Sequence, residues 1–277
     1  MTRLLDLPGV REAVEQAREA CTGLRWHEAL RRRIPEAAAE SRVRGARANA
    51  ALDGAQLPVD VVRDLVRGAR PWPEQPDPVE LVVRGAVQAT AETEHLRSLV
   101  IGAPAQALAR LHVAATAGLL PADQVGRPRT DDEPVAELVD LGEPPPAAVV
   151  ATRLVGLAEL VAGAGRLPVA VVAALAHAEI CVLRPFARGN GLVARALERA
   201  VVQAAGLDPT GVAVPEAGHL AAGGTAGGAA YLGALTGYAT GTPEGVALWL
   251  VQAARGLSLG AEEGRRIADA VLVGRLT

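Results

Sequence analysis

The sequence predicts an all-α protein with at most one small β-hairpin. Apolar residues recur every three to four positions over most of its 277 residues, which is the spacing of helices that bury one face. One short stretch, Val135 to Leu141, carries a strand-like signal. Half of the residues are apolar but only 2% are aromatic, so small aliphatic side chains must fill the core between the helices.

The N-terminal part of the chain is expected to be a helical arm. Amphipathic patterns cover residues 9–21 and 24–40. The Pro-rich segment of residues 71–78 then interrupts the pattern, because each X-Pro unit favours extended backbone. We therefore divide the chain into an arm, residues 1–78, and a main body, residues 79–277.

The body is expected to be helical apart from one irregular segment. The predicted helices cover residues 79–100, 104–118, 147–162, 168–183 and 191–206. Residues 121–146 are polar and irregular, and they contain the strand-like stretch. Residues 218–230 are rich in Gly and Ala and fit either a tightly packed helix or a loop, and residues 243–276 are expected to form two closing helices.

Composition and charge exclude several classes of function. All 28 basic residues are Arg, which excludes a Walker-type phosphate loop and a lysine Schiff base. A net charge of −3 with dispersed Arg argues against nucleic-acid binding. Asp6 and Arg11 come too early for a secretory signal, and Pro168 and Glu179 interrupt the most apolar stretch, so we expect no membrane association. Two cysteines are too few for a disulfide framework, and a cytoplasmic location is expected.

The segment of residues 184–191, Arg-Pro-Phe-Ala-Arg-Gly-Asn-Gly, links two strong helical patterns. Pro185 ends the first helix, and Gly189 and Gly191 permit a tight turn. The next helix begins at once, so its unpaired N–H groups and the positive end of its dipole form an anion site. Arg195 lies about one turn further on and can reach the same spot. The alternative is a simple turn flanked by solvated arginines.

This segment resembles the signature of the Fic (filamentation-induced-by-cAMP, or Fido) family, His-Pro-Phe-x-Asp/Glu-Gly-Asn-Gly-Arg-x-x-Arg. The matching positions are Pro185, Phe186, Gly189, Asn190, Gly191 and Arg195. The family layout is also matched by His177, Gly126-Arg-Pro-Arg129, Pro144-Pro-Pro146, Tyr231 and Trp249. The resemblance implies a Fic-like helical bundle with one small β-hairpin flap over most of the chain after the Pro-rich segment.

Three motif positions depart from the family, whose members transfer AMP or another phosphate-bearing group from a nucleotide to a protein hydroxyl. The motif histidine, the general base, is Arg184 here, and a guanidinium cannot accept the proton. The acid that holds Mg²⁺ is Arg188, and the first motif arginine is Leu192. We therefore predict no catalytic residue and no metal ligand in the motif, and whether the chain is an enzyme stays open. The other histidines of the body, none of them in the loop, are His95, His112, His177 and His219.

The hypothesis that follows is a degenerate Fic-like protein, a pseudoenzyme with little or no AMP-transferase activity and a regulatory or interaction role. ATP, another nucleotide or a phosphate anion would bind without Mg²⁺ at Arg188, Gly189, Asn190, Gly191 and Arg195. The alternatives are an AMP transferase with altered chemistry and a helical scaffold that binds nothing. A protein target would pair with the edge of the flap.

A second motif lies in the arm. Asn49-Ala-Ala-Leu-Asp53-Gly54 resembles the family's inhibitory motif, Ser/Thr-x-x-x-Glu-Gly/Asn, in which a helix places its glutamate on the last motif arginine. The resemblance implies that Asp53 contacts Arg195 and blocks the nucleotide site. The alternative is a helix end followed by a turn.

Overall fold

The computed structural model describes residues 2–116, 118–130, 133–137 and 141–275. These residues form helices joined by loops and include no strand, so the predicted all-α class is confirmed. The α-helices are α1 (Thr2–Leu5), α2 (Val10–Arg25), α3 (Ile34–Leu52), α4 (Val59–Arg67), α5 (Pro78–Glu92), α6 (Leu99–Gly102), α7 (Pro104–Thr116), α8 (Ala147–Ala162), α9 (Val169–Leu183), α10 (Asn190–Ala204), α11 (Pro215–Ala222), α12 (Gly228–Ala239) and α13 (Pro243–Leu272).

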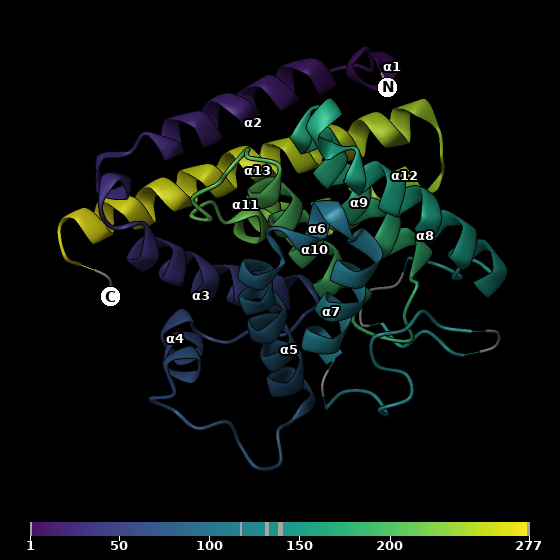
Figure 1. Ribbon diagram of the computed structural model, residues 1–277, viewed down its shortest axis with the longest axis horizontal. Coiled ribbons are helices and arrows are strands. Elements are labelled where there is room, and N and C mark those ends of the chain that lie inside the picture. The colour runs from purple at the N-terminus through teal and green to yellow at the C-terminus, as the bar shows by residue number, and fades with distance from the viewer. Residues whose placement is uncertain (1, 117, 131–132, 138–140, 276–277) are drawn as a thin grey trace.

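The long helix α13 is the spine of the molecule, and α2, α9, α11 and α12 pack along it (Figure 1). The side chain of Thr242 caps its start by accepting a hydrogen bond from the Gly245 N–H, and Pro243 occupies the first turn. The prediction of two helices over residues 243–276 is wrong, because α13 is continuous. Its glycines are packing positions: a methyl group on Gly260 would lie 2.7 Å from the backbone oxygen of Val214.

Residues 218–230, for which the sequence allowed a helix or a loop, contain both. Helix α11 ends at Ala222, a short 3-10 turn covers Gly224–Ala226, and α12 begins at Gly228. Gly218 of α11 faces Gly256 of α13, where a methyl group would lie 1.7 Å from the Gly256 oxygen. The small residues therefore allow two helix backbones to approach closely.

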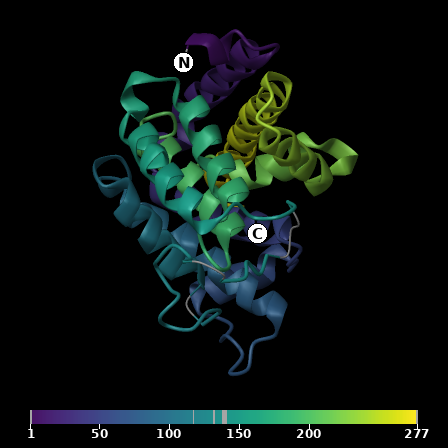
Figure 2. The same ribbon diagram turned by 90° about the vertical axis from the view of Figure 1, so that its right-hand side faces the viewer.

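Helix α3 brings the arm against the body. It packs on α5, α11 and α13 as well as on its neighbour α4. Figure 2 shows the molecule turned by 90°, with the long yellow helix α13 beside the purple helix α2. Helix α5 begins directly after the Pro-rich segment with a capping box, in which Asp77 and Glu80 each accept the other's backbone N–H. The division of the chain at residue 78 stays a prediction. The C-terminal end of α3 lies against the start of α10, where Asn49 contacts Leu192 and Arg195.

The expected β-hairpin flap is not present in the described part of residues 121–146, and this prediction is wrong there. Val135, Ala136, Glu137 and Leu141 adopt no strand, whereas residues 138–140 of the predicted arm lie outside the described residues. The physical reason is the pairing partner. The Ala136 N–H donates to the oxygen of Ala187 at 2.8 Å, so this segment pairs with the loop after α9 and not with a second flap arm.

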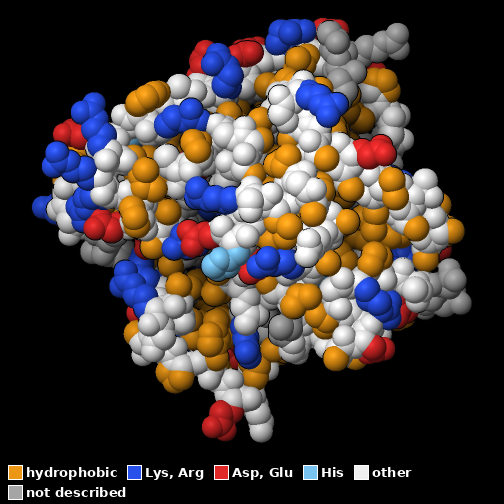
Figure 3. All heavy atoms as spheres, viewed as in Figure 1, with side chains coloured by type: hydrophobic (Ala, Val, Ile, Leu, Met, Phe, Trp, Pro, Cys, Tyr) orange, Lys and Arg blue, Asp and Glu red, His pale blue; other side chains and the backbone are white. Residues whose placement is uncertain are grey.

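Charged side chains of both signs are interspersed with apolar ones on the face shown in Figure 3. Among the helices that the structure describes, none has the length and apolar character needed to cross a bilayer.

Candidate functional site

The loop between α9 and α10 has a strained start. Arg184 has φ 45° and ψ 64°, the one left-handed conformation of a non-glycine residue within the described ranges. This conformation costs an L-residue about 1–2 kcal/mol. It stops α9 and turns the chain toward Pro185, and Gly189, with φ 81°, then precedes the first turn of α10.

Two residues from distant segments hold this loop in place. Arg129 donates from its backbone N–H to the Pro185 oxygen at 2.7 Å and from Nε to the Arg184 oxygen at 2.9 Å. His112 of α7 stacks on Phe186 with ring centroids 3.8 Å apart. Its Nδ1 accepts from the Gly126 N–H at 2.9 Å, so Nε2 carries the proton and donates to the Arg188 oxygen at 3.2 Å. The element around Gly126 and Arg129 therefore supports the loop.

The side chain of Asn190 stabilises the loop by hydrogen bonds to the backbone of Phe186. Its Oδ1 accepts from the Phe186 N–H at 2.9 Å, and its Nδ2 donates to the Phe186 oxygen at 2.9 Å. Phe186 is itself buried against the core. The side chain of Asn190 therefore fixes the turn, while its backbone N–H points out of the start of α10.

Arg195 lies one turn further along α10 and is 1% exposed. Its Nε donates to Oδ1 of Asn49 at 2.5 Å, its Nη2 to Oδ1 of Asp53 at 2.6 Å and its Nη1 to the Tyr231 hydroxyl at 3.2 Å. Burial alone would lower the pKa of Arg195, but the charge and hydrogen bond of Asp53, together with Tyr231 and Cys181, outweigh it and the pKa is raised. The motif from Asn49 to Asp53 is thus brought onto Arg195, and Gly54 ends its helix with φ 83°.

A carboxylate that the sequence analysis did not single out as a site residue lies at the start of α10. Oε1 of Glu137 accepts from the backbone N–H of Asn190 at 2.9 Å and from its Nδ2 at 2.6 Å. The sequence offered only its position after the Gly126–Arg129 element as a signal. Burial, together with the charge of Asp53, raises the pKa of Glu137 to about 7.

These groups enclose a cavity of about 20 Å³, roughly the space that one water needs. It is lined by Asp53, Glu137, Leu141, Cys181, Arg184, Asn190, Gly191, Arg195, Tyr231 and Leu235. Gly191 leaves room for the Asp53–Arg195 pair, since a methyl group on it would lie 2.7 Å from Oδ1 of Asp53 and move this carboxylate. Of the predicted site residues, Asn49, Gly54, Arg188 and Gly189 do not line the cavity, although Asn49 contacts Arg195.

The two substituted arginines differ in position. Arg184 is 6% exposed and donates from Nη1 to the Gly142 oxygen at 2.6 Å, which ties the loop to the end of residues 121–142, the flap segment. Arg188 is half-buried. Its guanidinium makes no hydrogen bond or ion pair with the residues that the structure describes.

Behind Arg195, a chain of hydrogen bonds runs into the core. The Tyr231 hydroxyl meets Nε2 of His177 at 2.7 Å, Nδ1 of His177 meets Glu198 at 2.5 Å, and Nε2 of His219 meets the same Glu198 oxygen at 2.7 Å. His177, Glu198 and His219 could be considered metal ligands. However, these separations are hydrogen-bond lengths, and ligands bound to one zinc ion at about 2.1 Å would stand further apart. The group is therefore a buried polar network.

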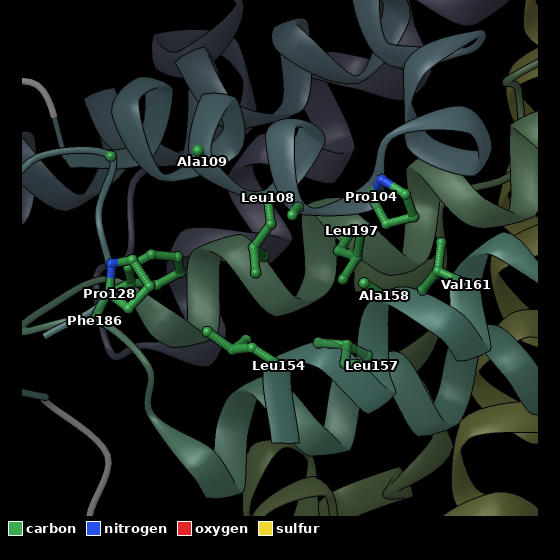
Figure 4. A pocket seen from close by; sticks show the side chains of 12 residues that line it. Pro104, Leu108, Ala109, Pro128, Leu154, Leu157, Ala158, Val161, Phe186 and Leu197 are labelled. Atoms are coloured by element: carbon green, nitrogen blue, oxygen red, sulfur yellow. The ribbon is translucent and has the colours of Figure 1, made fainter. Parts of the chain in front are cut away.

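A second cavity, of about 150 Å³, lies between α7, α8 and α10 (Figure 4). Leu108 of α7, Leu154 and Leu157 of α8 and Leu197 of α10 point into it, and Phe186 closes one end. Its walls are almost entirely apolar, so it offers no group that would recognise a phosphate. The polar cavity at Arg195 is the candidate site.

Comparisons with known proteins agree with this geometry at the level of the fold. No protein-family model and no curated protein sequence matches the chain. A Fic family protein from Desulfovibrio desulfuricans is 19% identical, with a TM-score of 0.68 over 98% of this chain and 76% of that one. Fic-1 from Caenorhabditis elegans, residues 134–508, is 16% identical, with a TM-score of 0.66 over 96% and 73%.

A Fic domain containing signaling protein from Bacteroides thetaiotaomicron is 13% identical, with a TM-score of 0.64 over 93% of this chain and 98% of that one. Identities this low define the fold alone. The chain therefore has the Fic fold.

Proposed function

We propose that the chain is a Fic-like regulatory or interaction protein, with little or no AMP-transferase activity, whose phosphate-binding cleft is held closed by its own Asp53. The observation that carries the proposal is that the Arg195 guanidinium is already fully hydrogen-bonded within the chain. All three of its nitrogen atoms are engaged, by Asn49, Asp53 and Tyr231, around a cavity of about 20 Å³. A phosphate group needs this guanidinium and has to displace Asp53 to reach it.

The groups that transfer chemistry would need are replaced. At the position of the general base, Arg184 donates hydrogen bonds and has no lone pair to accept a proton. At the position of the first motif arginine, Leu192 is 2% exposed and packs close to Gly85 of α5 in the core. These observations support binding without transfer.

Mg²⁺ does not fit the residues present. The motif acid is Arg188, and the two carboxylates in the cavity, Asp53 and Glu137, already accept hydrogen bonds from Arg195 and Asn190. Mg²⁺ also needs six oxygen ligands in a near-ideal octahedron, and no carboxylate other than these two lines the cavity among the described residues. A phosphate would instead be held by the Arg195 guanidinium and the backbone N–H groups of Asn190 and Gly191.

Isothermal titration calorimetry with ATP, with and without Mg²⁺, tests the proposal. We expect weak or no binding by the wild-type chain and Mg²⁺-independent binding by Asp53→Ala, because removal of the carboxylate frees the Arg195 guanidinium. Asp53→Asn keeps a hydrogen-bond acceptor without charge and should bind less tightly than Asp53→Ala. Binding should be lost again in Asp53→Ala with Arg195→Ala.

Asp64→Ala is the matched control, because Asp64 is exposed on α4 and should leave binding at the wild-type level. Labelling of a protein by the wild-type chain with radioactive ATP would contradict the proposal. If neither Asp53 variant binds ATP, the chain is a scaffold without a nucleotide site.

A further inference from the structure

Glu137 occupies the position that an incoming anion would take at the start of α10. One of its oxygens, Oε1, accepts both the Asn190 backbone N–H, at 2.9 Å, and the Asn190 side-chain Nδ2, at 2.6 Å. The backbone N–H is one of the unpaired donors of the first helical turn, where the helix dipole favours negative charge. The protein therefore supplies its own anion to this position.

The segment that carries Glu137 is fastened to the loop at two points. The Arg129 N–H bonds to Pro185 at 2.7 Å, and the Ala136 N–H bonds to Ala187 at 2.8 Å. Glu133, which lies between these two residues in the sequence, pairs with Arg127 at 2.8 Å. The carboxylate of Glu137 is thus held at α10 by backbone pairing and not only by its own side chain.

The charges around Glu137 come from four helices and the loop. Asp53 of α3 and Arg195 of α10 face it, and Cys181 of α9, Tyr231 of α12 and Arg184 of the loop line the same cavity. Arg195 is already neutralised by Asp53 at 2.6 Å. Glu137 is therefore a second carboxylate beside one paired cation, which is why burial and the charge of Asp53 raise its pKa to about 7.

We infer that Glu137 is an intramolecular occupant of the anion site at the start of α10, and that a phosphate group must displace it in addition to Asp53. This inference rests on the proposed function, since it concerns the same cleft. Glu137 adds a second barrier to phosphate binding, and this barrier comes from a different segment than Asp53. The two carboxylates can leave the cleft separately, and the barrier from Glu137 weakens when Glu137 takes up a proton. Movement of residues 133–137 away from the loop would open the site without any change at α3.

The first test needs no ligand. Amide hydrogen exchange measured by NMR should show the Asn190 N–H protected in the wild-type chain and exchanging at least tenfold faster in Glu137→Ala, because its acceptor is gone. Glu143→Ala is the matched control, since Glu143 is exposed beyond the flap segment and should leave Asn190 protected. An equal exchange rate at Asn190 in the wild-type and Glu137→Ala chains overturns the inference.

The second test measures binding of sulfate, which does not titrate between pH 5 and pH 8, by calorimetry. In the Asp53→Ala chain, the loss of the Asp53 charge and the unpaired Arg195 lower the pKa of Glu137 from its wild-type value. Sulfate should therefore bind more tightly at pH 5 than at pH 8, because protonated Glu137 no longer repels it. In the chain with Asp53→Ala and Glu137→Ala, affinity should be higher and should not vary between these pH values.

Glu137→Gln preserves the shape of the side chain if the alanine variant does not fold. In the Asp53→Ala background it should also remove the pH dependence, but bind sulfate less tightly than Glu137→Ala because its amide oxygen still accepts from Asn190. Equal sulfate affinities in all Glu137 variants, with binding present in Asp53→Ala, overturn the inference and leave the proposed function standing. Absence of binding in every variant instead contradicts the proposed function, while the exchange experiment still decides whether Glu137 occupies the site.

Discussion

Individual polar residues at the start of α10 act as pairs whose partners lie far apart in the chain. Arg195 is a fully buried cation, which the interior tolerates only because Asp53 and Asn49 surround it. The side chain of Asn190 bonds to the Phe186 backbone, and its backbone N–H and Nδ2 both donate to Glu137. The same donors that would recognise a phosphate are therefore satisfied inside the molecule.

His112 is the residue with the clearest pH-dependent effect on stability. Its Nδ1 must remain unprotonated to accept from Gly126, and burial lowers its pKa from 6.5 to about 4. As the pH falls below 6.5, the unfolded chain takes up a proton that the folded chain resists, so the folded state loses stability between about pH 6.5 and pH 4.

Urea unfolding at pH 7 and pH 4.5 should show that His112→Gln removes about 2 kcal/mol of the loss in unfolding free energy seen in the wild-type chain. The exposed His95 provides the control, because His95→Gln should keep the wild-type pH dependence. If His112→Gln keeps it as well, the neutral state assigned to His112 is wrong.

At the scale of elements, one face of α10 lines the polar cavity and another face packs in the core. Arg195 and Asn190 line the polar cavity, whereas Leu192 and Leu197 belong to the buried core. The family position of the first motif arginine thus lies on the core side of this helix. The departure at Leu192 is a packing feature as well as the loss of a phosphate donor.

Leu192→Arg, which would restore the motif arginine, should therefore lower the unfolding free energy by about 3 kcal/mol or more, because it buries an unpaired cation beside α5. Denaturant unfolding followed by circular dichroism measures the change. Leu192→Met conserves volume and should cost less than about 1.5 kcal/mol. An arginine variant as stable as the wild-type chain would show that this face is open to solvent.

At the scale of the whole molecule, α13 joins the arm to the body. Helix α2 lies on one side of it, α11 and α12 lie on another, and α3 contacts it as well (Figure 1). The contact with α11 depends on glycine, because Gly218 and Gly256 bring two backbones together. This contact keeps the C-terminal helices in one core with α3, the helix that presents Asp53.

Gly218→Ala should destabilise the whole fold by about 1–3 kcal/mol, because its methyl group overlaps the Gly256 oxygen. Gly233 on α12 is the matched helical control: a methyl group there meets no atom within 4 Å, so Gly233→Ala should raise stability by about 0.5–1 kcal/mol. Thermal unfolding of both variants measures the difference. A neutral Gly218→Ala would mean that α11 can move away from α13 at little cost.

The parts of the structure that could be predicted are those that short stretches of sequence control. Helical periodicity, Pro185 and the glycines at 189 and 191 are local signals, and they correctly predicted α7 to α10 and the turn before α10. The pattern over residues 24–40 spans the break between α2 and α3, and the helix predicted over 79–100 extends past the end of α5. The contact of Asp53 with Arg195 followed from a motif resemblance and not from periodicity. The two helices predicted over residues 243–276 are one helix, α13, whose Gly256 and Gly260 lie where a neighbouring backbone needs the space.

Only the tertiary structure showed that Glu137 also closes the cleft. Glu137 meets Asn190 from 53 positions away in the chain, and the flap segment pairs with the Ala187 backbone where its own residues predicted a hairpin. A backbone N–H bonds to whichever acceptor the fold brings near, and burial then sets the charge that a carboxylate can carry. Both depend on the position of helices separated widely in the sequence, which no local pattern encodes.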